Sequence, residues 1–253
     1  MDAVFVALVT MASTFGGAMA GMWLKTVLPA HHLDDDSRDI IKLATGLVAT
    51  MTALVLGLVI ATAKGTFDKV DASLEDASAN ILALDRVLAR FGPETAPIRD
   101  AIRSTVARRI DEVWRSDGLP PRTDDSAADT AAVEGIMTNV SALAAATDAQ
   151  RELHAEAIKL GNDILRDRWL VRERGTSAVE RPFLVVLICW LTLIFASFGL
   201  FAPRHSTMVG VLGLCALSVS AAVFLILEMD GPFTGVMKVS SGPMRFLLAH
   251  LGQ

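Results

Sequence analysis

The strongest constraint on this chain is an apolar helical pattern that continues, without proline, into polar sequence. Residues 40–63 (IIKLATGLVATMTALVLGLVIATA) are long enough, at about 1.5 Å per residue, to cross a hydrocarbon core about 30 Å thick. The apolar residues that follow recur at alternating spacings of three and four: Phe67, Val70, Leu74, Ala77, Ile81, Leu84, Leu88 and Phe91. This a/d pattern predicts a stalk helix that associates with copies of itself.

Three more segments have the length and apolarity of membrane spans. We expect spans at about 3–28, 40–63, 182–202 and 206–228. The first begins Met1-Asp2 with no basic region and has no persuasive cleavage site before Trp23, so we interpret it as a span rather than a signal peptide. The short turn at 202–205 predicts that the last two spans form an antiparallel hairpin.

Most of the charge lies between the second and third spans. Residues 64–181 hold 17 of the 23 basic and 21 of the 28 acidic residues, and this net acidic balance excludes a nucleic-acid platform. Helical apolar stripes recur in this segment at 98–113, 133–143 and 153–171, separated by a clear loop at 118–126. The sequence therefore predicts an all-α membrane protein with four domains: a hairpin at 1–63, a helical cytoplasmic domain at 64–181, a hairpin at 182–228 and a tail at 229–253.

Basic residues near the span ends indicate the orientation. Seven flank the soluble domain: Lys64, Lys69, Arg166, Arg168, Arg172, Arg174 and Arg181. Four lie on the other side: Lys25, Arg38, Lys42 and Arg204. The positive-inside rule then places the 64–181 domain and both termini in the cytoplasm.

The second span carries the main functional candidates. Thr50, Leu54 and Leu58 are spaced i, i+4 and i+8 on one narrow helical face, with Gly57 and Thr62 nearby. Two interpretations are open: ordinary helix packing, or a ring of such faces that forms a hydrophobic neck. In the second interpretation Lys42, Lys64 and Lys69 lie at the mouths of the pore and favour anions.

A cluster of histidines and acids precedes the second span. It comprises His31, His32, Asp34, Asp35 and Asp36. The spacing matches no metal loop, so we expect no metal there. A helix cap from Asp36 or Ser37 and an acidic ring at an outer vestibule are the remaining interpretations.

The sequence favours neither an enzyme nor a cofactor-binding protein. His154 has no paired nucleophile, Glu228 and Asp230 lie at a span end, and Cys189 and Cys215 fall inside predicted spans. The spans have essentially no ionisable residue in their interiors, which argues against proton-coupled transport. An alternative is a stator-like scaffold that transmits force or signal through a partner, because such assemblies also place a helical domain between the second and third spans.

Two stretches carry a family resemblance. Residues 28–68 (LPAHHLDDDSRDIIKLATGLVATMTALVLGLVIATAKGTFD) and 227–243 (LEMDGPFTGVMKVSSGP) resemble bacterial bestrophin-like proteins, a family of unknown function distantly similar to bestrophin channels. The resemblance covers most of the chain. It implies a homopentamer in the bacterial inner membrane that conducts anions such as chloride, without a cofactor.

The resemblance also implies site residues and two departures from true bestrophins. The VLG match places the neck at Thr50, Leu54 and Leu58, where true bestrophins have aromatic residues. The tail lacks the acidic run that helps animal bestrophins to bind calcium, so we expect no calcium clasp. The expected partners are the lipid bilayer, further copies of the chain and inorganic ions.

Overall fold

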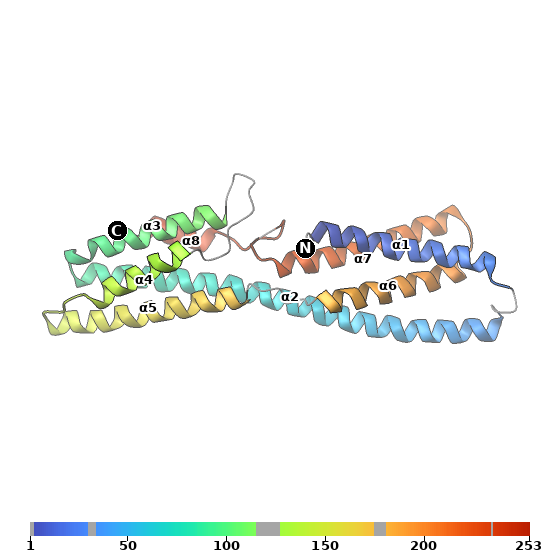
Figure 1. Ribbon diagram of the computed structural model, residues 1–253, viewed down its shortest axis with the longest axis horizontal. Coiled ribbons are helices and arrows are strands. Elements are labelled where there is room, and N and C mark those ends of the chain that lie inside the picture. Colours follow the sequence, from blue (N-terminus) through green and yellow to red (C-terminus); the bar gives the residue numbers. More distant parts are fainter. Residues whose placement is uncertain (1–2, 30–33, 115–126, 175–180, 234) are drawn as a thin grey trace. The chain divides into compact units, whose positions relative to one another are not determined.

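Every regular element in the part of the chain that the structure describes is a helix. The computed structural model describes residues 3–29, 34–114, 127–174, 181–233 and 235–253. Its elements, in order, are α1 (Ala3–Val27), α2 (Asp35–Phe91), a 3-10 turn (Pro93–Thr95), α3 (Ala96–Val113), α4 (Ala127–Ser141), α5 (Asp148–Arg174), α6 (Arg181–Phe201), α7 (Ser206–Asp230) and α8 (Gly242–His250) (Figure 1). These ranges contain no strand, and α1, α2, α6 and α7 are long and apolar enough to span a membrane. The predictions of an all-α fold and of four long apolar helices are confirmed.

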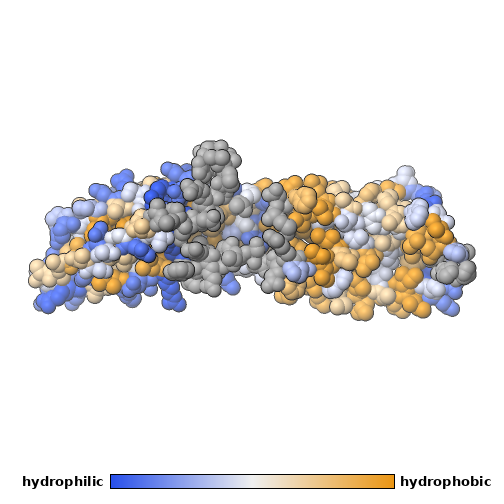
Figure 2. Space-filling view, viewed as in Figure 1, coloured by the Kyte–Doolittle hydropathy of each residue, from blue (hydrophilic) through white to orange (hydrophobic). Residues whose placement is uncertain are grey.

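The chain divides into two compact units. The apolar unit contains Met1–Thr66 and Ser177–Asp230, and the polar unit contains Phe67–Thr176 and Gly231–Gln253. Hydrophobic residues dominate the visible surface of the first, and hydrophilic residues that of the second (Figure 2). The predicted loop at 118–126 lies outside the described residues.

In the apolar unit, α1 packs against α6 and α7 (Figure 1). Glycines bring the backbones of α1 and α6 together: a Cβ on Gly17 would lie 2.8 Å from the Thr192 carbonyl oxygen, and one on Gly21 would collide with the backbone of Ala196. Such small residues allow close approach of membrane helices, where van der Waals packing supplies much of the association energy.

The carboxyl ends of α1 and α6 are capped reciprocally. Lys25 of α1 donates to the Ala202 carbonyl after α6 (3.1 Å), and Arg204 donates to the Met22 carbonyl of α1 (2.7 Å). The carboxyl end of a helix carries partial negative charge, so cations near it are stabilising. Two of the basic residues that predict the orientation therefore also tie α1 to the carboxyl end of α6 and the turn after it.

The core of the polar unit combines the second half of α2 with α3, α4, α5 and α8. The predicted stripe of α3 is buried throughout: Ile98, Ile102, Val106, Ile110 and Val113. Ile136 and Val140 of α4 and Ala157 of α5 join the same cluster, and Leu247 and Leu251 of the tail complete it. The expectation of amphipathic helices in this segment is confirmed, although α8 shows that the tail also contains a nine-residue helix.

The structure corrects the expectation for the stalk seam. Val70, Leu84, Leu88 and Phe91 are each at most 5% exposed within the single chain. Leu84 and Leu88 pack in the core of the polar unit, while Phe67, Val70 and Leu74 pack against Val239, Trp114 and Phe233. An a/d pattern indicates only that a helix has apolar neighbours, and here the neighbours come from the same chain. The interpretation of this seam as a self-association surface is therefore wrong.

A buried ion pair joins α2 to α3. Asp85 is fully buried and accepts from Arg99 Nε at 2.7 Å and from Arg99 Nη2 at 3.0 Å. The Gly252 amide also donates to Asp85, at 3.3 Å, which ties the residues after α8 to the same carboxylate. The hydrogen bonds to Asp85 raise the pKa of Arg99 above its ordinary value, so the guanidinium stays charged.

Replacing Gly21 by leucine tests the close approach of α1 and α6. The side chain would meet the backbone of Ala196, which must shift, and overpacking of this kind destabilises by about 1–3 kcal/mol. We expect a lower thermal unfolding temperature of the full chain in detergent. Gly16→Leu is the control because nothing lies within 4 Å of a Cβ there; equal losses in both variants would contradict the packing argument.

Replacing Asp85 by alanine tests the ion pair. The change leaves the Arg99 guanidinium, 19% exposed, without its carboxylate, and breaking a buried pair in this way destabilises by about 3–5 kcal/mol. Thermal unfolding followed by circular dichroism measures the loss.

Two further variants of the chain serve as controls for the Asp85→Ala experiment. Asp111→Ala, at an exposed position of α3, is expected to stay within about 0.5 kcal/mol of the wild type. Asp85→Leu combined with Arg99→Met removes both charges, so this double variant should recover part of the loss. Similar stabilities of the Asp85→Ala and Asp111→Ala variants would show that the ion pair contributes little.

Candidate functional site on helix α2

The membrane segment of α2 is the least covered of the four candidate spans. Only 6% of its most apolar window is buried within the chain, against 22% in α1, 33% in α6 and 28% in α7. All four windows are strongly apolar, so composition does not explain the difference. Helix α2 therefore offers an unusually large apolar surface to lipid or to another protein chain.

One side of this segment is occupied by the rest of the apolar unit. Thr45 donates to Ser197 of α6 at 2.9 Å, and Thr52 is buried. Leu56, Val59 and Ala63 pack with Leu184 and Ile226, which belong to α6 and α7. The five α2 positions recur at spacings of seven, four, three and four, which places them on one helical face.

The opposite side carries large, exposed aliphatic residues. We call this surface the α2 apolar face; its residues, each between 46% and 75% exposed, are Ile40, Leu43, Leu47, Met51, Leu54 and Leu58. Their spacings of three, four, four, three and four keep them on one side of the helix. The face ends near Leu58, before the buried seam that begins at Phe67.

The sequence-predicted neck residues all lie on the exposed part of α2. Thr50, Gly57 and Thr62 are exposed together with Leu54 and Leu58. The hydroxyl of Thr50 donates to the Gly46 carbonyl and that of Thr62 to the Leu58 carbonyl, both at 2.9 Å. Because these hydroxyl hydrogens are engaged in the helix, they are not available to donate to an anion, although the oxygen atoms can still accept from water.

The predicted mouth charges differ in their surroundings. Lys42 pairs with Asp39 at 3.0 Å, which offsets its positive charge. Lys64 and Lys69 are exposed, and the sequence around them also contains Asp68 and Asp71. The local charge at this end of the segment is therefore mixed rather than uniformly positive.

The predicted vestibule cluster is described only in part. His31 and His32 lie outside the described residues. Asp34 accepts from the Ser37 amide at 3.0 Å and so caps the amino end of α2, while Asp35 and Asp36 occupy its first turn. The expected cap is present, but Asp34 provides it rather than Asp36 or Ser37. Among the described residues no group of His, Cys, Asp and Glu is arranged to hold a metal.

The remaining titratable candidates have structural surroundings. His154 Nε2 lies 2.9 Å from the Val140 carbonyl oxygen, and its ring meets Phe91 edge-on at 6.4 Å between centroids. Glu228 is buried at the end of α7. Cys189 and Cys215 are both exposed and unbonded to each other. Nothing in these contacts assembles a nucleophile and a base.

Comparison with known families identifies the chain. A family model described as the bestrophin-like domain matches residues 12–244. The chain belongs to the bestrophin-like family. Bestrophin-like proteins are related to bestrophins, which form ion channels, and the expected family is thereby confirmed. No curated protein and no solved structure shows a significant match to the chain.

Within this bestrophin-like protein, sequence reasoning finds part of the exposed face and misses part of it. Leu43 and Leu47 are absent from the predicted neck residues, although they share the helical face of Leu54 and Leu58. A signal exists in the sequence, because Ile40, Leu47 and Leu54 are seven residues apart. Hydropathy hides this signal, since nearly every position in the segment is apolar or small and the two sides of the helix look alike.

Proposed function

We propose that the chain is a homo-oligomeric ion channel, most simply a pentamer, in which copies of the α2 apolar face surround the pore and form a hydrophobic neck. The family relation supports a channel. The observation that carries the assignment to α2 is its low coverage: of the four candidate spans it buries the least within its own chain. A face made of large aliphatic residues, with the hydroxyl hydrogens of neighbouring Thr50 and Thr62 bonded within the helix, suits a constriction that excludes water until it opens.

The proposal replaces the stalk seam as the contact between copies. The seam at 67–91 is filled by the polar unit of the same chain, so the copies would meet through the segment before it. In this arrangement the packed side of α2 fixes the helix to α6 and α7, and the opposite side is free for the pore. Anions are the proposed permeant ions because Lys64 and Lys69 follow the neck along the chain.

The proposed topology follows from charge. The polar unit and both termini are assigned to the cytoplasm, with the bacterial inner membrane as the location, on the basis of the basic residues around its two junctions. A stator-like scaffold without conductance is the alternative from another class. Co-purification of a single-span partner, together with absent conductance in the wild type, would favour that alternative.

Replacing Leu54 by serine tests the neck. A hydroxyl at a dewetting constriction stabilises water there, so we expect planar-bilayer recordings of the purified protein to show a several-fold higher open probability or conductance than the wild type. Ile60→Ser is the matched control: Ile60 is also exposed but is outside the α2 apolar face. An equal effect in both variants, or no conductance in any of them, would contradict the proposed neck.

Replacing both Lys64 and Lys69 by glutamate tests anion preference. Reversal of two charges near a pore mouth lowers the local concentration of anions, so the reversal potential under a salt gradient should move toward that of the cation. Lys159→Glu, an exposed change on α5, should leave the reversal potential unchanged. A reversal potential that is the same in all three proteins would show that these lysines do not set selectivity.

A further inference from the structure

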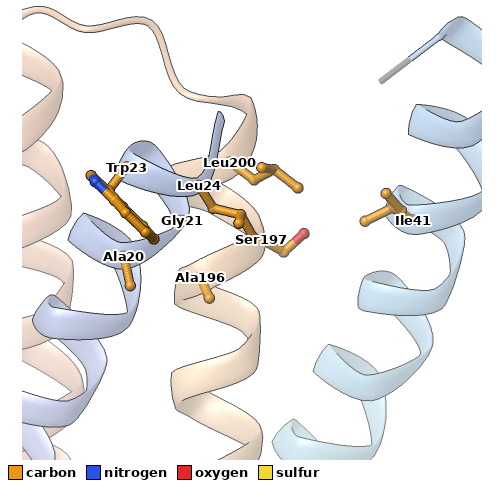
Figure 3. Close-up of a pocket in the computed structure, with 8 residues that line it drawn as sticks. All are labelled: Ala20, Gly21, Trp23, Leu24, Ile41, Ala196, Ser197 and Leu200. Carbon is orange, nitrogen blue, oxygen red and sulfur yellow. The ribbon is translucent and has the colours of Figure 1, made fainter. Parts of the chain in front are cut away.

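An apolar crevice lies between α2 and the packed pair of α1 and α6. Its volume is about 310 Å³, and it is lined by Trp23 and Leu24 of α1, Ile41 of α2, and Ser197 and Leu200 of α6, with Ala and Gly residues behind them (Figure 3). Leu200 and Ser197 point toward α2, and Ile41 points back toward them (Figure 3). The volume is at the lower end of the range of about 300–1,000 Å³ for ligand pockets, so the crevice accommodates a portion of a ligand.

The crevice exists because small residues face α2 at this level. Ala20, Gly21 and Ala196 contribute almost no side-chain volume, and they lie where α1 and α6 already touch through their backbones. One turn further along α2, Thr45 donates to Ser197 and closes the gap between α2 and α6. That bond also engages the hydroxyl oxygen of Ser197, so the walls present mainly hydrocarbon to any occupant.

A guanidinium with an unused donor lies beside the crevice. Arg38 precedes Ile41 by one turn of α2, and its Cζ is 5.9 Å from the ring centroid of Phe201, which follows Leu200. Its Nε is buried and has no hydrogen-bond partner among the described residues. Asp35 lies 3.7 Å from Nη1, which is long for a hydrogen bond. The Arg38 side chain as a whole is 41% exposed, so an anionic group can approach the outer part of the guanidinium.

The neighbouring cations are already engaged by the protein. Lys25 and Arg204 donate to the ends of α6 and α1, and Lys42 pairs with Asp39. Arg38 also has a carboxylate partner, Asp35, but it differs from these residues because it lies over the ring of Phe201, next to the crevice lining. It combines a positive charge with a partly exposed side chain, one helical turn before Ile41 of the crevice lining.

We propose that the crevice binds one acyl chain of a phospholipid whose phosphate accepts from the guanidinium of Arg38, whose side chain is 41% exposed. The site requires an amphiphile with an anionic group next to a hydrocarbon chain. It lies near the carboxyl end of α1 and the amino end of α2, where head groups meet the protein. Asp35, 99% exposed beside Arg38, adds negative charge at the same end. This charge pattern favours a head group that carries an ammonium as well as a phosphate, namely an aminophospholipid of the phosphatidylethanolamine type.

Native mass spectrometry of the full chain in a mild detergent tests the proposal. The probes are dioleoyl phosphatidylethanolamine, dioleoyl phosphatidylglycerol and oleic acid, each titrated against the delipidated protein. The wild type is expected to bind the first most tightly. Equal binding of phosphatidylglycerol would overturn the assignment of the head group, and equal binding of oleic acid would overturn the role of the phosphate.

Two pairs of variants separate the head-group contact from the crevice. Arg38→Gln removes the charged donor and is expected to weaken phosphatidylethanolamine binding by about tenfold or more, whereas Lys159→Gln, at an exposed position of α5, is expected to leave it unchanged. Ile41→Phe fills the crevice from α2 without touching the α1–α6 contact, so it should also weaken binding, and Ile60→Phe is its control at an exposed position.

All four variants are first checked for wild-type thermal unfolding and size-exclusion behaviour. Unchanged lipid binding in Arg38→Gln, or in Ile41→Phe, would overturn the proposed site. The site does not depend on conductance, so the result is independent of the channel proposal.

Discussion

The structure depends on the packing of one side of α2 within each unit of the chain. In the apolar unit the packed positions from Thr45 to Ala63 contact α6 and α7, and in the polar unit those from Phe67 to Phe91 lie in its core. Because this side is used within the chain, α2 has only its other surface left for contacts outside the chain. In the membrane segment that surface is aliphatic, and beyond Thr66 it becomes charged. The division of the chain into an apolar and a polar unit follows from this change.

The residues directly after α2 end this helix and turn the chain back, so that α3 can pack against α2. Gly92 has a φ of 152°, which a residue with a Cβ rarely adopts, and Pro93 prevents the helix from continuing. Buried Thr95 donates to the carbonyls of Leu88 and Gly92, so the last turn keeps its hydrogen bonds. The chain then reverses into α3, whose stripe of isoleucines and valines covers the seam that α2 has just presented.

The sequence predicts the helices well and their partners less well. Length, apolarity and the Gly92-Pro93 stop are local signals, so the four long apolar helices and the α3 stripe can be recognised. Whether the Phe67–Phe91 seam meets another copy or the same chain depends on tertiary packing, which periodicity does not encode. The exposed face is only partly predictable because Leu43 and Leu47 are as apolar as their neighbours. The crevice beside Arg38 arises from small residues of α1 and α6. These two helices are far apart in the sequence, so no spacing along the chain predicts the crevice.

The two faces of α2 also bear on how this protein diverges. Substitutions at Leu88 or Val70 disturb a core in which each side chain is almost wholly enclosed, whereas substitutions at the exposed Leu47 or Leu54 disturb little within the subunit. The first group is therefore constrained by folding of the monomer, and the second is not. Related sequences are accordingly expected to retain the seam, while the exposed positions of α2 are set only by what they contact outside the chain.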